Sequence, residues 1–465
     1  MDTNANAKGY SLTACGGVGN ATGANFWVQT PSMQFLVDCG LVQGSQYATD
    51  ENRQPFPYKP GQISCLLITH AHMDHVGRIP KLVKEGFKGV IYSTPETKDL
   101  AALMLDDALG LITREAEQRG VPAIYGAEDV AKAMSLWKTV GYHAALDLST
   151  DVSMFLKDAG HVLGSSIIEV MLRGARGGAG VKIAFTGDLG NSPTPLLRDT
   201  EYVTDADYIV MESVYGDRNH EAKNVRDERL KTVLGETLRA GGTVVIPAFS
   251  LERTQVILYE IHELFEKGAL PTVPVYLDSP LGLKVTEVYK KYEYDFNADR
   301  QKEIAAGGQL FDMPGLKIVR NHQESSAIDR IQGPKIIISG SGMSVGGRVI
   351  NHERDLLGDP KATIIIVGYQ VPGSLGREIE ERAKRVNVDG TDVSVHARIE
   401  TISGYSSHKD SDHLVEFVSH AAPRVKEVFV AMGETKSSAF LAQRLRDELS
   451  VNAIVAEKGK EYSLD

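Results

Sequence analysis

Four side chains of the types that bind metal ions occur within six positions, in the segment His70-Ala71-His72-Met73-Asp74-His75. The segment follows the apolar run at residues 63–69, which is typical of a buried strand. Because side chains two positions apart on an extended backbone point the same way, His70 and His72 would share one side. The other two ligands begin an amphipathic stretch with helical spacing and would point back to the same place. Imidazole and carboxylate together favour zinc or a neighbouring first-row metal, and this set can serve two adjacent ions.

Three further candidate ligands stand close to strand-like runs elsewhere in the chain. Asp38 follows residues 35–37, Asp188 follows residues 181–185, and His161 lies in a glycine-containing stretch. In α/β proteins, functional sites gather at the ends of strands. Taken singly, an aspartate after a strand is usually a cap or turn residue, and a lone histidine usually bonds to its neighbours. Their common placement, beside the first cluster, favours one shared site.

The elements that would position these residues follow an α/β pattern along the whole chain. Continuous apolar runs are typical of parallel strands covered on both faces, and the stretches between them have helical spacing. We expect strands at residues 35–37, 65–68, 89–92, 181–185, 208–211, 243–246, 275–277, 335–338 and 363–367, and helices at residues 97–119, 128–140, 226–238 and 253–267. A fresh series begins near Asp205, which indicates a second domain.

Length, charge and cysteine content narrow the class of protein. A chain of 465 residues is expected to form two domains. Residues 1–6 are polar and no apolar run reaches the roughly 18 residues of a membrane span, so we expect a cytoplasmic protein. Cys39 and Cys65 lie in apolar patterns and are expected to be packed, reduced thiols. The net charge of −11 argues against a surface that is basic throughout, but it allows a local basic groove.

In order along the chain, the candidate ligands resemble the metal motifs of the metallo-β-lactamase fold. The later part of the chain resembles the β-CASP branch of that superfamily, the nucleic-acid-processing metallohydrolases. The segments that carry this second resemblance are residues 211–218, 246–250, 275–280, 346–352 and 402–408. Each short motif is weakly specific, but their number and order, over almost the whole chain, make the combination strongly specific.

The resemblance implies an α/β fold, a metallo-β-lactamase αββα sandwich with an inserted β-CASP α/β domain. We expect the sandwich to comprise residues 1–205 and 390–465, and the insert to comprise residues 206–389. The alternative arrangement, two sequential domains, would leave His408 away from the other ligands.

The resemblance also implies two Zn²⁺ ions per chain and a division of the ligands between them. The first ion would take His70, His72 and His161, the second Asp74, His75 and His408, and Asp188 would bridge both. Asp38 would orient these ligands from behind rather than bind metal itself.

The candidate catalytic residues are Asp74, His352 and Glu212. Glu212 and His352 match the acidic and histidine motifs of the β-CASP branch. His352 would contact the scissile phosphate or protonate the leaving oxygen, with Glu212 helping to hold it. The alternative interpretation is that Glu212 is a capping or ion-paired glutamate and that His352 is a surface histidine. The glycine-rich residues 339–347, just before His352, would present backbone N–H groups to phosphate.

The implied reaction is hydrolysis of an RNA phosphodiester bond, which leaves a 5′-phosphate and a 3′-hydroxyl. Two zinc ions about 3.5–4 Å apart would hold a hydroxide at neutral pH, and His408 favours RNA over DNA. We expect single-stranded RNA in a narrow cleft between the domains, where basic side chains hold its phosphates. The candidate substrate-binding residues are Ser341, Ser344, Arg348 and Arg377, with Arg218 and Arg253 as further cleft arginines.

Three other functions compete with this one. A thioesterase-like hydrolase of small substrates would not need the inserted domain. A non-catalytic RNA-processing scaffold would not need every ligand position to be filled, and a pure RNA-binding module would be expected to be more basic. The choice between endonuclease and 5′-exonuclease stays open, as does a homodimer.

Overall fold

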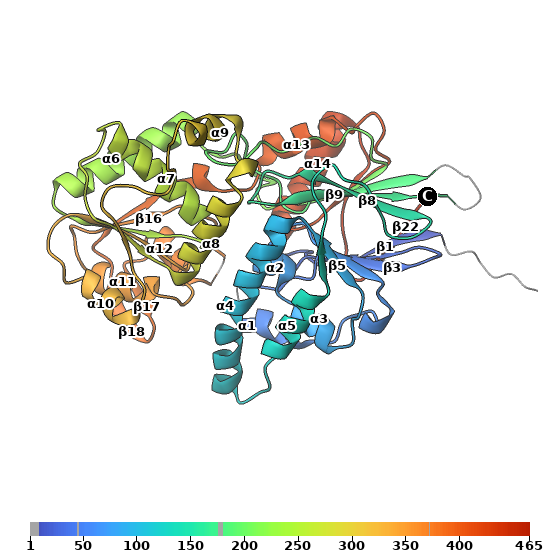
Figure 1. Cartoon of the computed structure of the whole chain (residues 1–465), viewed down its shortest axis with the longest axis horizontal. Coiled ribbons are helices and arrows are strands. Elements are labelled where there is room, and N and C mark those ends of the chain that lie inside the picture. The colour runs from blue at the N-terminus through green and yellow to red at the C-terminus, as the bar shows by residue number, and fades with distance from the viewer. Residues whose placement is uncertain (1–8, 44–45, 175–179, 372) are drawn as a thin grey trace, which may run out of the picture. The chain divides into compact units, whose positions relative to one another are not determined.

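The computed structural model describes residues 9–43, 46–174, 180–371 and 373–465, and these form two compact units. The first unit contains the described residues up to 194, together with 198–219 and 408–465. The second unit contains residues 195–197 and 220–407. The first unit is therefore built from segments that lie far apart in the sequence (Figure 1).

Two seven-stranded sheets form the centre of the first unit. The first sheet has the strand order β22 (Glu461–Leu464), β1 (Tyr10–Gly16), β2 (Asn25–Gln29), β3 (Gln34–Val37), β4 (Cys65–Leu67), β5 (Val90–Ser93) and β6 (Trp137–Thr139). The second sheet has the order β21 (Ala453–Val455), β20 (Glu427–Val430), β11 (Tyr208–Met211), β10 (Val181–Phe185), β9 (Ser166–Leu172), β8 (Val152–Asp158) and β7 (Leu146–Asp147). Phe26 and Phe35 of the first sheet share one apolar core with Phe185 and Phe429 of the second, so the two sheets pack face to face.

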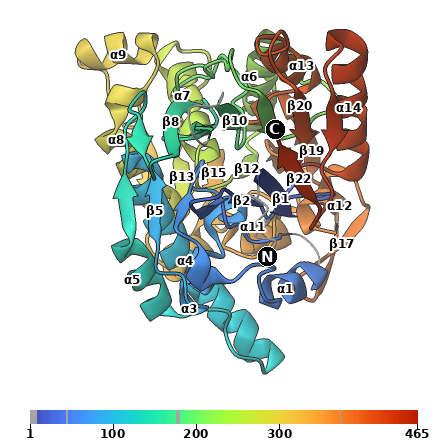
Figure 2. The ribbon, with the colours of Figure 1, turned by 90° about the vertical axis from the view of Figure 1, so that its right-hand side faces the viewer.

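Helices cover the outer faces of both sheets (Figure 2). On the second sheet, Ile209 packs with Phe417 and Leu441 of the two C-terminal helices. On the first sheet, Leu66 points away from the inter-sheet core and is still fully buried, as is Leu100 in a covering helix. The helices of this unit are α1 (Gln46–Arg53), η1 (Pro60–Gln62), α2 (Met73–Val76), α3 (Ile79–Lys84), α4 (Pro95–Arg119), α5 (Ala127–Ser135), α13 (Ser411–Ser419) and α14 (Thr435–Leu449). The layers are thus αββα, and the predicted sandwich is confirmed.

The second unit is built on one six-stranded parallel sheet. Its order is β14 (Leu316–Ile318), β13 (Val275–Asp278), β15 (Lys335–Ser339), β12 (Thr243–Pro247), β16 (Thr363–Ile366) and β19 (Arg398–Thr401). Its helices are α6 (Lys223–Arg239), α7 (Arg253–Glu266), α8 (Pro280–Lys291), η3 (Glu293–Asp295), α9 (Ala298–Ala305), α10 (His322–Ile328), α11 (Val349–Leu356), α12 (Leu375–Glu380) and η4 (Ser403–Tyr405). A separate hairpin joins β17 (Arg385–Val388) to β18 (Thr391–Ser394).

The bounds of the two units differ from the predicted domain bounds in two places. The strand at residues 208–211 was assigned to the insert, but β11 pairs with β10 and β20 in the first unit. The return to the sandwich was placed at residue 390, but β19 pairs with β16 in the second unit. The apolar runs predict both strands correctly, whereas sheet membership depends on long-range pairing that a local pattern does not encode.

The described cysteines and helices bear on two further predictions. Cys39 and Cys65 are buried and unpaired, as predicted, and burial raises the pKa of each thiol to about 12. Among the residues that the structure describes, no helix combines the length and apolar character that crossing a bilayer requires.

Candidate metal centre

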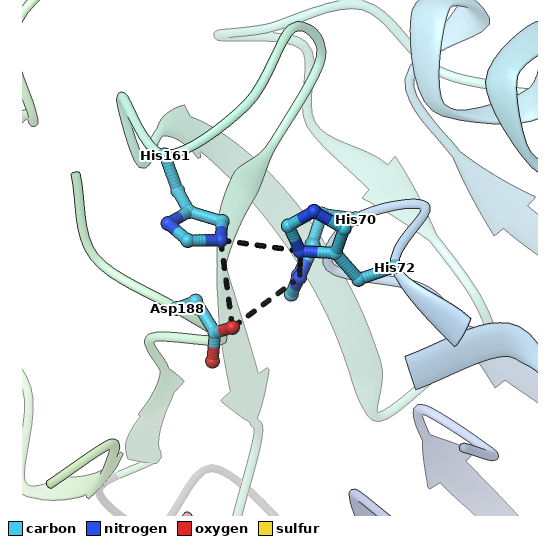
Figure 3. A group of neighbouring side chains, drawn as sticks. All are labelled: His70, His72, His161 and Asp188. Carbon is cyan, nitrogen blue, oxygen red and sulfur yellow. Dashed lines mark hydrogen bonds and ion pairs between the residues drawn. The ribbon is translucent and has the colours of Figure 1, made fainter. Parts of the chain in front are cut away.

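Three histidines and one aspartate converge in the first unit, and all four are predicted metal ligands (Figure 3). One ligand atom from each of His70, His72, His161 and Asp188 lies within 4.8 Å of the others. Nε2 of His70 is 3.4 Å and Nε2 of His161 is 3.5 Å from Oδ2 of Asp188. Nδ1 of His72 is 3.1 Å from Nε2 of His70 and 3.3 Å from Nε2 of His161.

Short loops at strand ends place these four side chains. His70 comes from the loop after β4, and His72 is the N-cap residue of α2. Asp188 follows β10, and His161 follows β8 with its backbone N–H donating to Oγ of Ser165 at 3.0 Å. The turn before His161 requires glycine: Gly160 has φ +65°, and a Cβ there would lie 2.8 Å from the backbone nitrogen of Thr200.

A second group of ligand atoms shares Asp188 with the first. It consists of Asp188, Glu212 and His408, with one ligand atom of each within 4.8 Å of the others. Nδ1 of His408 hydrogen-bonds to Oε2 of Glu212 at 3.0 Å, and it lies 3.9 Å from Oδ2 of Asp188. The other oxygen of Glu212 accepts the backbone N–H of Leu189 at 2.6 Å. Glu212 therefore fixes both the loop that carries Asp188 and the ring of His408.

Asp38 lies behind the ligands, where it was predicted to orient them. It has φ +58°, and its carboxylate accepts the backbone N–H of Thr69 at 2.9 Å and the hydroxyl of Thr69 at 2.8 Å. Its Oδ2 also lies 2.7 Å from Nδ1 of His75. With Nδ1 engaged in this way, Nε2 of His75 faces Oδ1 of Asp188 at 3.4 Å and Oδ2 of Asp74 at 3.9 Å.

Two buried polar atoms of this centre have no hydrogen-bond partner among the described residues. They are Nε2 of His75 and Oδ1 of Asp188. An unsatisfied buried polar atom costs about 1–3 kcal/mol, and a metal ion between the two would satisfy both. The donor set of imidazoles and carboxylates is also the one that zinc takes. The residues present therefore fit a divalent metal.

The protonation states of the first group suit metal binding. Burial lowers the pKa of His70, and it lowers the pKa values of His72 and His161 well below the usual range. Burial alone would raise the pKa of Asp188, but the neighbouring histidines hold it well below its ordinary value. Neutral imidazoles and an ionised carboxylate are the forms that coordinate metal.

One predicted contact is wrong. Glu212 was expected to help hold His352, but its two oxygens bond to Leu189 and His408 in the first unit. The sequence motif predicts a functional role for Glu212 without revealing its partner His408, because the two residues are almost two hundred positions apart.

His352 lies in the second unit and is completely buried. Its Nε2 is 2.8 Å from Oδ2 of Asp278, and its Nδ1 is 2.9 Å from both oxygens of Asp329. With both ring nitrogens held by carboxylates, His352 joins three segments of the unit and does not present a nitrogen to phosphate, contrary to the prediction. The motif did not reveal the two aspartates, which come from the end of β13 and from the C-cap of α10.

The predicted substrate-binding residues of the second unit fall into two kinds. Arg348 donates to Oδ1 of Asp278 at 2.6 Å and to the carbonyl of Val319 at 3.1 Å, and the hydroxyl of Ser344 donates to Glu353 at 2.5 Å. These two side chains are mostly buried and bond to other segments of the second unit.

Exposed or half-buried side chains form the other kind. The side chain of Arg377 is 38% exposed and pairs with Glu381 at 2.6 Å, and Ser341 is half-buried. Of the further arginines, Arg218 is 48% exposed and pairs with Asp217, whereas Arg253 is buried and its guanidinium lies 5.9 Å from the centroid of the Tyr405 ring. Exposure thus leaves Arg218, Arg377 and Ser341 as the accessible candidates.

Sequence comparison places known families on both units. Residues 23–144 match the metallo-β-lactamase superfamily, residues 254–379 match the Beta-Casp domain, and residues 392–456 match the Zn-dependent metallo-hydrolase RNA specificity domain. The chain is 33% identical to Ribonuclease TTHA0252 of Thermus thermophilus over 97% of this chain and 96% of that protein. It is 31% identical to the transcription termination factor FttA of Methanosarcina mazei over 95% of this chain and 69% of that protein.

A solved structure shares the fold. It is the crystal structure of a protein of unknown function from Enterococcus faecalis V583, with a TM-score of 0.57 and 11% sequence identity over 98% of this chain and 100% of that chain. At that identity the likeness concerns the fold alone. Together with the matched domains and the ribonuclease relative, these findings show that the chain belongs to the β-CASP branch of the metallo-β-lactamase superfamily.

Proposed function

We propose that this protein hydrolyses phosphodiester bonds in single-stranded RNA with a pair of zinc ions. Its family is one of metal-dependent hydrolases, and its matched RNA specificity domain and ribonuclease relative support RNA as the substrate. The observation that carries the proposal is the position of Asp188, whose Oδ2 lies 3.4 and 3.5 Å from Nε2 of His70 and of His161, and whose Oδ1 lies 3.4 Å from Nε2 of His75. A carboxylate common to two groups is the arrangement that holds two ions side by side.

The ligands are assigned to the two ions as the family resemblance implies. His70, His72 and His161 hold one ion, Asp74, His75 and His408 hold the other, and Asp188 binds both. When bound, the ions supply Lewis acidity to the phosphate and make a water molecule reactive near neutral pH.

The protein's own side chains orient the ligands and handle protons. The hydrogen bond from Nδ1 of His408 to Glu212 leaves Nε2 of His408 for coordination. Asp38 does the same for His75. The side chain of Asp74 is 17% exposed, more than those of His75 and Asp188, so it is the carboxylate placed to accept a proton from the attacking water.

Accessible side chains of the second unit are proposed to hold the RNA backbone. Arg377 is fixed by Glu381, which limits the entropy lost when its guanidinium contacts a phosphate. Ser341 precedes a turn in which its hydroxyl accepts the backbone N–H of Val345 at 3.2 Å. Arg385 is a matched control for Arg377, because it is also exposed and also paired with one acidic residue, Asp392.

End-labelled RNA tests the proposed reaction. The purified protein with zinc should cleave an unstructured strand and should leave the stem of a stable hairpin intact. Substrates with 5′-hydroxyl, 5′-monophosphate and 5′-triphosphate ends separate the two modes, because an endonuclease cleaves all three at internal positions and a 5′-exonuclease discriminates among them. Absence of RNA cleavage by the zinc-loaded protein would refute the proposal.

Phosphate contact has a separate test in the salt dependence of RNA binding. Arg377→Ala should weaken binding of single-stranded RNA and reduce the slope of log affinity against log salt by about 0.7, the value for one phosphate contact on a single strand. Arg385→Ala should leave that slope unchanged. Equal slopes for the two variants would remove Arg377 from the RNA contacts.

A further inference from the structure

The chain passes from the second unit to the first between Ser407 and His408. We call residues 402–411 the crossover segment. Its first half packs within the second unit and its second half within the first. His408, the predicted metal ligand, is the first residue after the change, so the position of its backbone depends on how both halves are anchored.

Tyr405 anchors the first half in a buried charged cluster. Its ring is 1% exposed, and its hydroxyl donates to Oε2 of Glu260 on α7. The other oxygen of Glu260 accepts a hydrogen bond from Nη2 of Arg226 on α6 at 2.7 Å. The guanidinium of Arg226 also lies over the Tyr405 ring, 4.7 Å from its centroid. The tyrosine is thus held both at its hydroxyl and on its face.

The backbone beside Tyr405 lies directly on the stem of Arg226. A Cβ added to Gly404 would stand 3.1 Å from Cβ and from Cδ of Arg226, closer than side chains normally approach. The backbone N–H of Gly404 and the hydroxyl of Ser403 both reach Oε1 of Glu221, each at 3.4 Å. Glycine at this position lets the crossover segment lie flat against α6.

The second half of the crossover segment is fixed by backbone contacts in the first unit. His408 forms an antiparallel bridge with Gly190, and the N–H of Lys409 donates to the carbonyl of Leu189 at 2.8 Å. Only two residues separate Tyr405 from His408, too few to absorb a shift of the tyrosine. Movement of the Tyr405 anchor would therefore be passed on to the ligand.

We propose that Tyr405 is a positioning residue for the metal centre: the cluster of Tyr405, Glu260 and Arg226 sets the path of the crossover segment so that His408 reaches its metal ion. The proposal rests on the proposed function, because it requires that His408 binds metal. Apolar packing alone would bury the ring equally well. A carboxylate that is itself held by an arginine also fixes where the hydroxyl points, and a buried ion pair can serve that specificity despite its desolvation cost.

Tyr405→Phe removes the hydroxyl and keeps the ring, and Tyr289→Phe is the matched control. Tyr289 is also fully buried in the second unit, and its hydroxyl also donates to a buried carboxylate, that of Glu252 at 2.5 Å. Both variants lose one hydrogen bond of the same kind, so their unfolding temperatures should fall by similar amounts. Only Tyr405 belongs to the crossover segment.

Metal affinity is the property that separates the two variants. Zinc titration against a chromophoric chelator should show the more weakly held ion of Tyr405→Phe loosened about tenfold, the lower end of what partners behind a ligand contribute. The visible absorption of the cobalt-substituted variant should also change. Tyr289→Phe should bind both ions as the wild type does. Glu260→Gln, which keeps an acceptor for Tyr405 but removes the charge that holds Arg226, should give a smaller loss in the same direction.

Two results would overturn this inference alone: wild-type metal affinity in both Tyr405→Phe and Glu260→Gln, or equal losses in Tyr405→Phe and Tyr289→Phe. In either case the wild type would still bind two ions and cleave RNA. A wild-type protein that binds no second ion would overturn the proposed function and this inference together.

Discussion

Asp188 belongs to both groups of ligand atoms found among the described residues, so its replacement should affect both ions. We expect Asp188→Asn to reduce the zinc content from about two ions per chain to less than one, measured by mass spectrometry of the dialysed protein. Asp74→Asn is the control, because Asp74 is assigned to the second ion only, so this variant should retain the ion held by His70, His72 and His161. Two ions in Asp188→Asn would contradict a bridging role.

In the proposed centre, Glu212 orients His408 toward its metal ion, and replacement of Glu212 tests this role. Glu212→Gln keeps the size of the side chain but weakens the hydrogen bond to Nδ1 of His408, which now spans 3.0 Å. Loss of such a partner typically costs 10–100-fold in metal affinity or activity. Titration with zinc should show the loss in the ion that His408 holds, while the ion held by His70 and His72 keeps its affinity. Unchanged affinity for both ions would leave Glu212 with only its contact to Leu189.

The sequence predicts which side chains lie close together in the first unit better than it predicts their hydrogen-bond partners. The cluster from His70 to His75 is readable because its spacing is local and its residue types are few. Asp278 and Asp329, which hold His352, carry no such signal, because an aspartate at a strand or helix end is common for other reasons. His352 is buried between these aspartates as a result of tertiary packing. The motif alone therefore predicts a substrate-contacting histidine, whereas the structure has a histidine that joins two carboxylates by hydrogen bonds.

At the scale of elements, continuous apolar runs predict the strands well, whereas the helical spacing of apolar residues predicts the ends of helices less well. The run at residues 181–185 is β10 with the same bounds, and the helix expected at residues 253–267 is α7 to within one residue. The helix expected at residues 128–140 ends at Ser135, because the chain then forms β6, an edge strand of the first sheet. Three residues of strand are too short for their alternation to compete with the helical pattern before them.

The hydrogen bonds of His352 to Asp278 and Asp329 should make the stability of the second unit depend on pH. Burial alone would lower its pKa, but the hydrogen bonds to Asp278 and Asp329 raise it to about 9. The folded state therefore binds this proton more tightly than the unfolded state. The stabilisation, on the order of 3 kcal/mol, is fully present below about pH 6.5 and is lost as pH rises to about 9. Chemical denaturation of His352→Asn should show no such decline in the free energy of unfolding between these pH values, and the zinc content of the variant should be unchanged. If the free energy of unfolding of the variant fell with pH as it does in the wild type, His352 would not be the source of the pH dependence.

Glu252 should produce a pH dependence over a lower range. It is buried at the start of α7, and burial raises its pKa to about 7 although Tyr289 donates a hydrogen bond to it. A carboxyl whose pKa is raised by folding destabilises the protein as pH rises from about 4.5 to about 7. Glu252→Gln keeps an acceptor for Tyr289 and removes the charge, so its free energy of unfolding should exceed that of the wild type at pH 8 and match it more closely at pH 5. Equal effects at both pH values would refute the assignment.

At the scale of the whole molecule, every predicted metal ligand lies in the first unit, although His408 follows the second unit in the sequence. The chain leaves the sandwich after residue 219 and returns at residue 408 with the last ligand. The centre is therefore complete only when both ends of the first unit have assembled. Metal binding should then be coupled mainly to the folding of this unit, and the second unit should contribute only through the Tyr405 anchor of one ligand.

The two tryptophans of the chain, Trp27 and Trp137, both lie in the first unit, so their fluorescence reports on that unit alone. Because a ligand that binds only the folded state stabilises it by mass action, free zinc at about a thousand times its Kd should add about 4 kcal/mol to the first unit. Removing zinc with a chelator should shift the fluorescence transition to lower temperature. Circular dichroism, which detects helices of both units, should then show a second transition that moves much less, because the second unit supports only one ligand, His408. Asp188→Asn should show no zinc-dependent shift, whereas a shift of both transitions by the same amount would mean that the units unfold together.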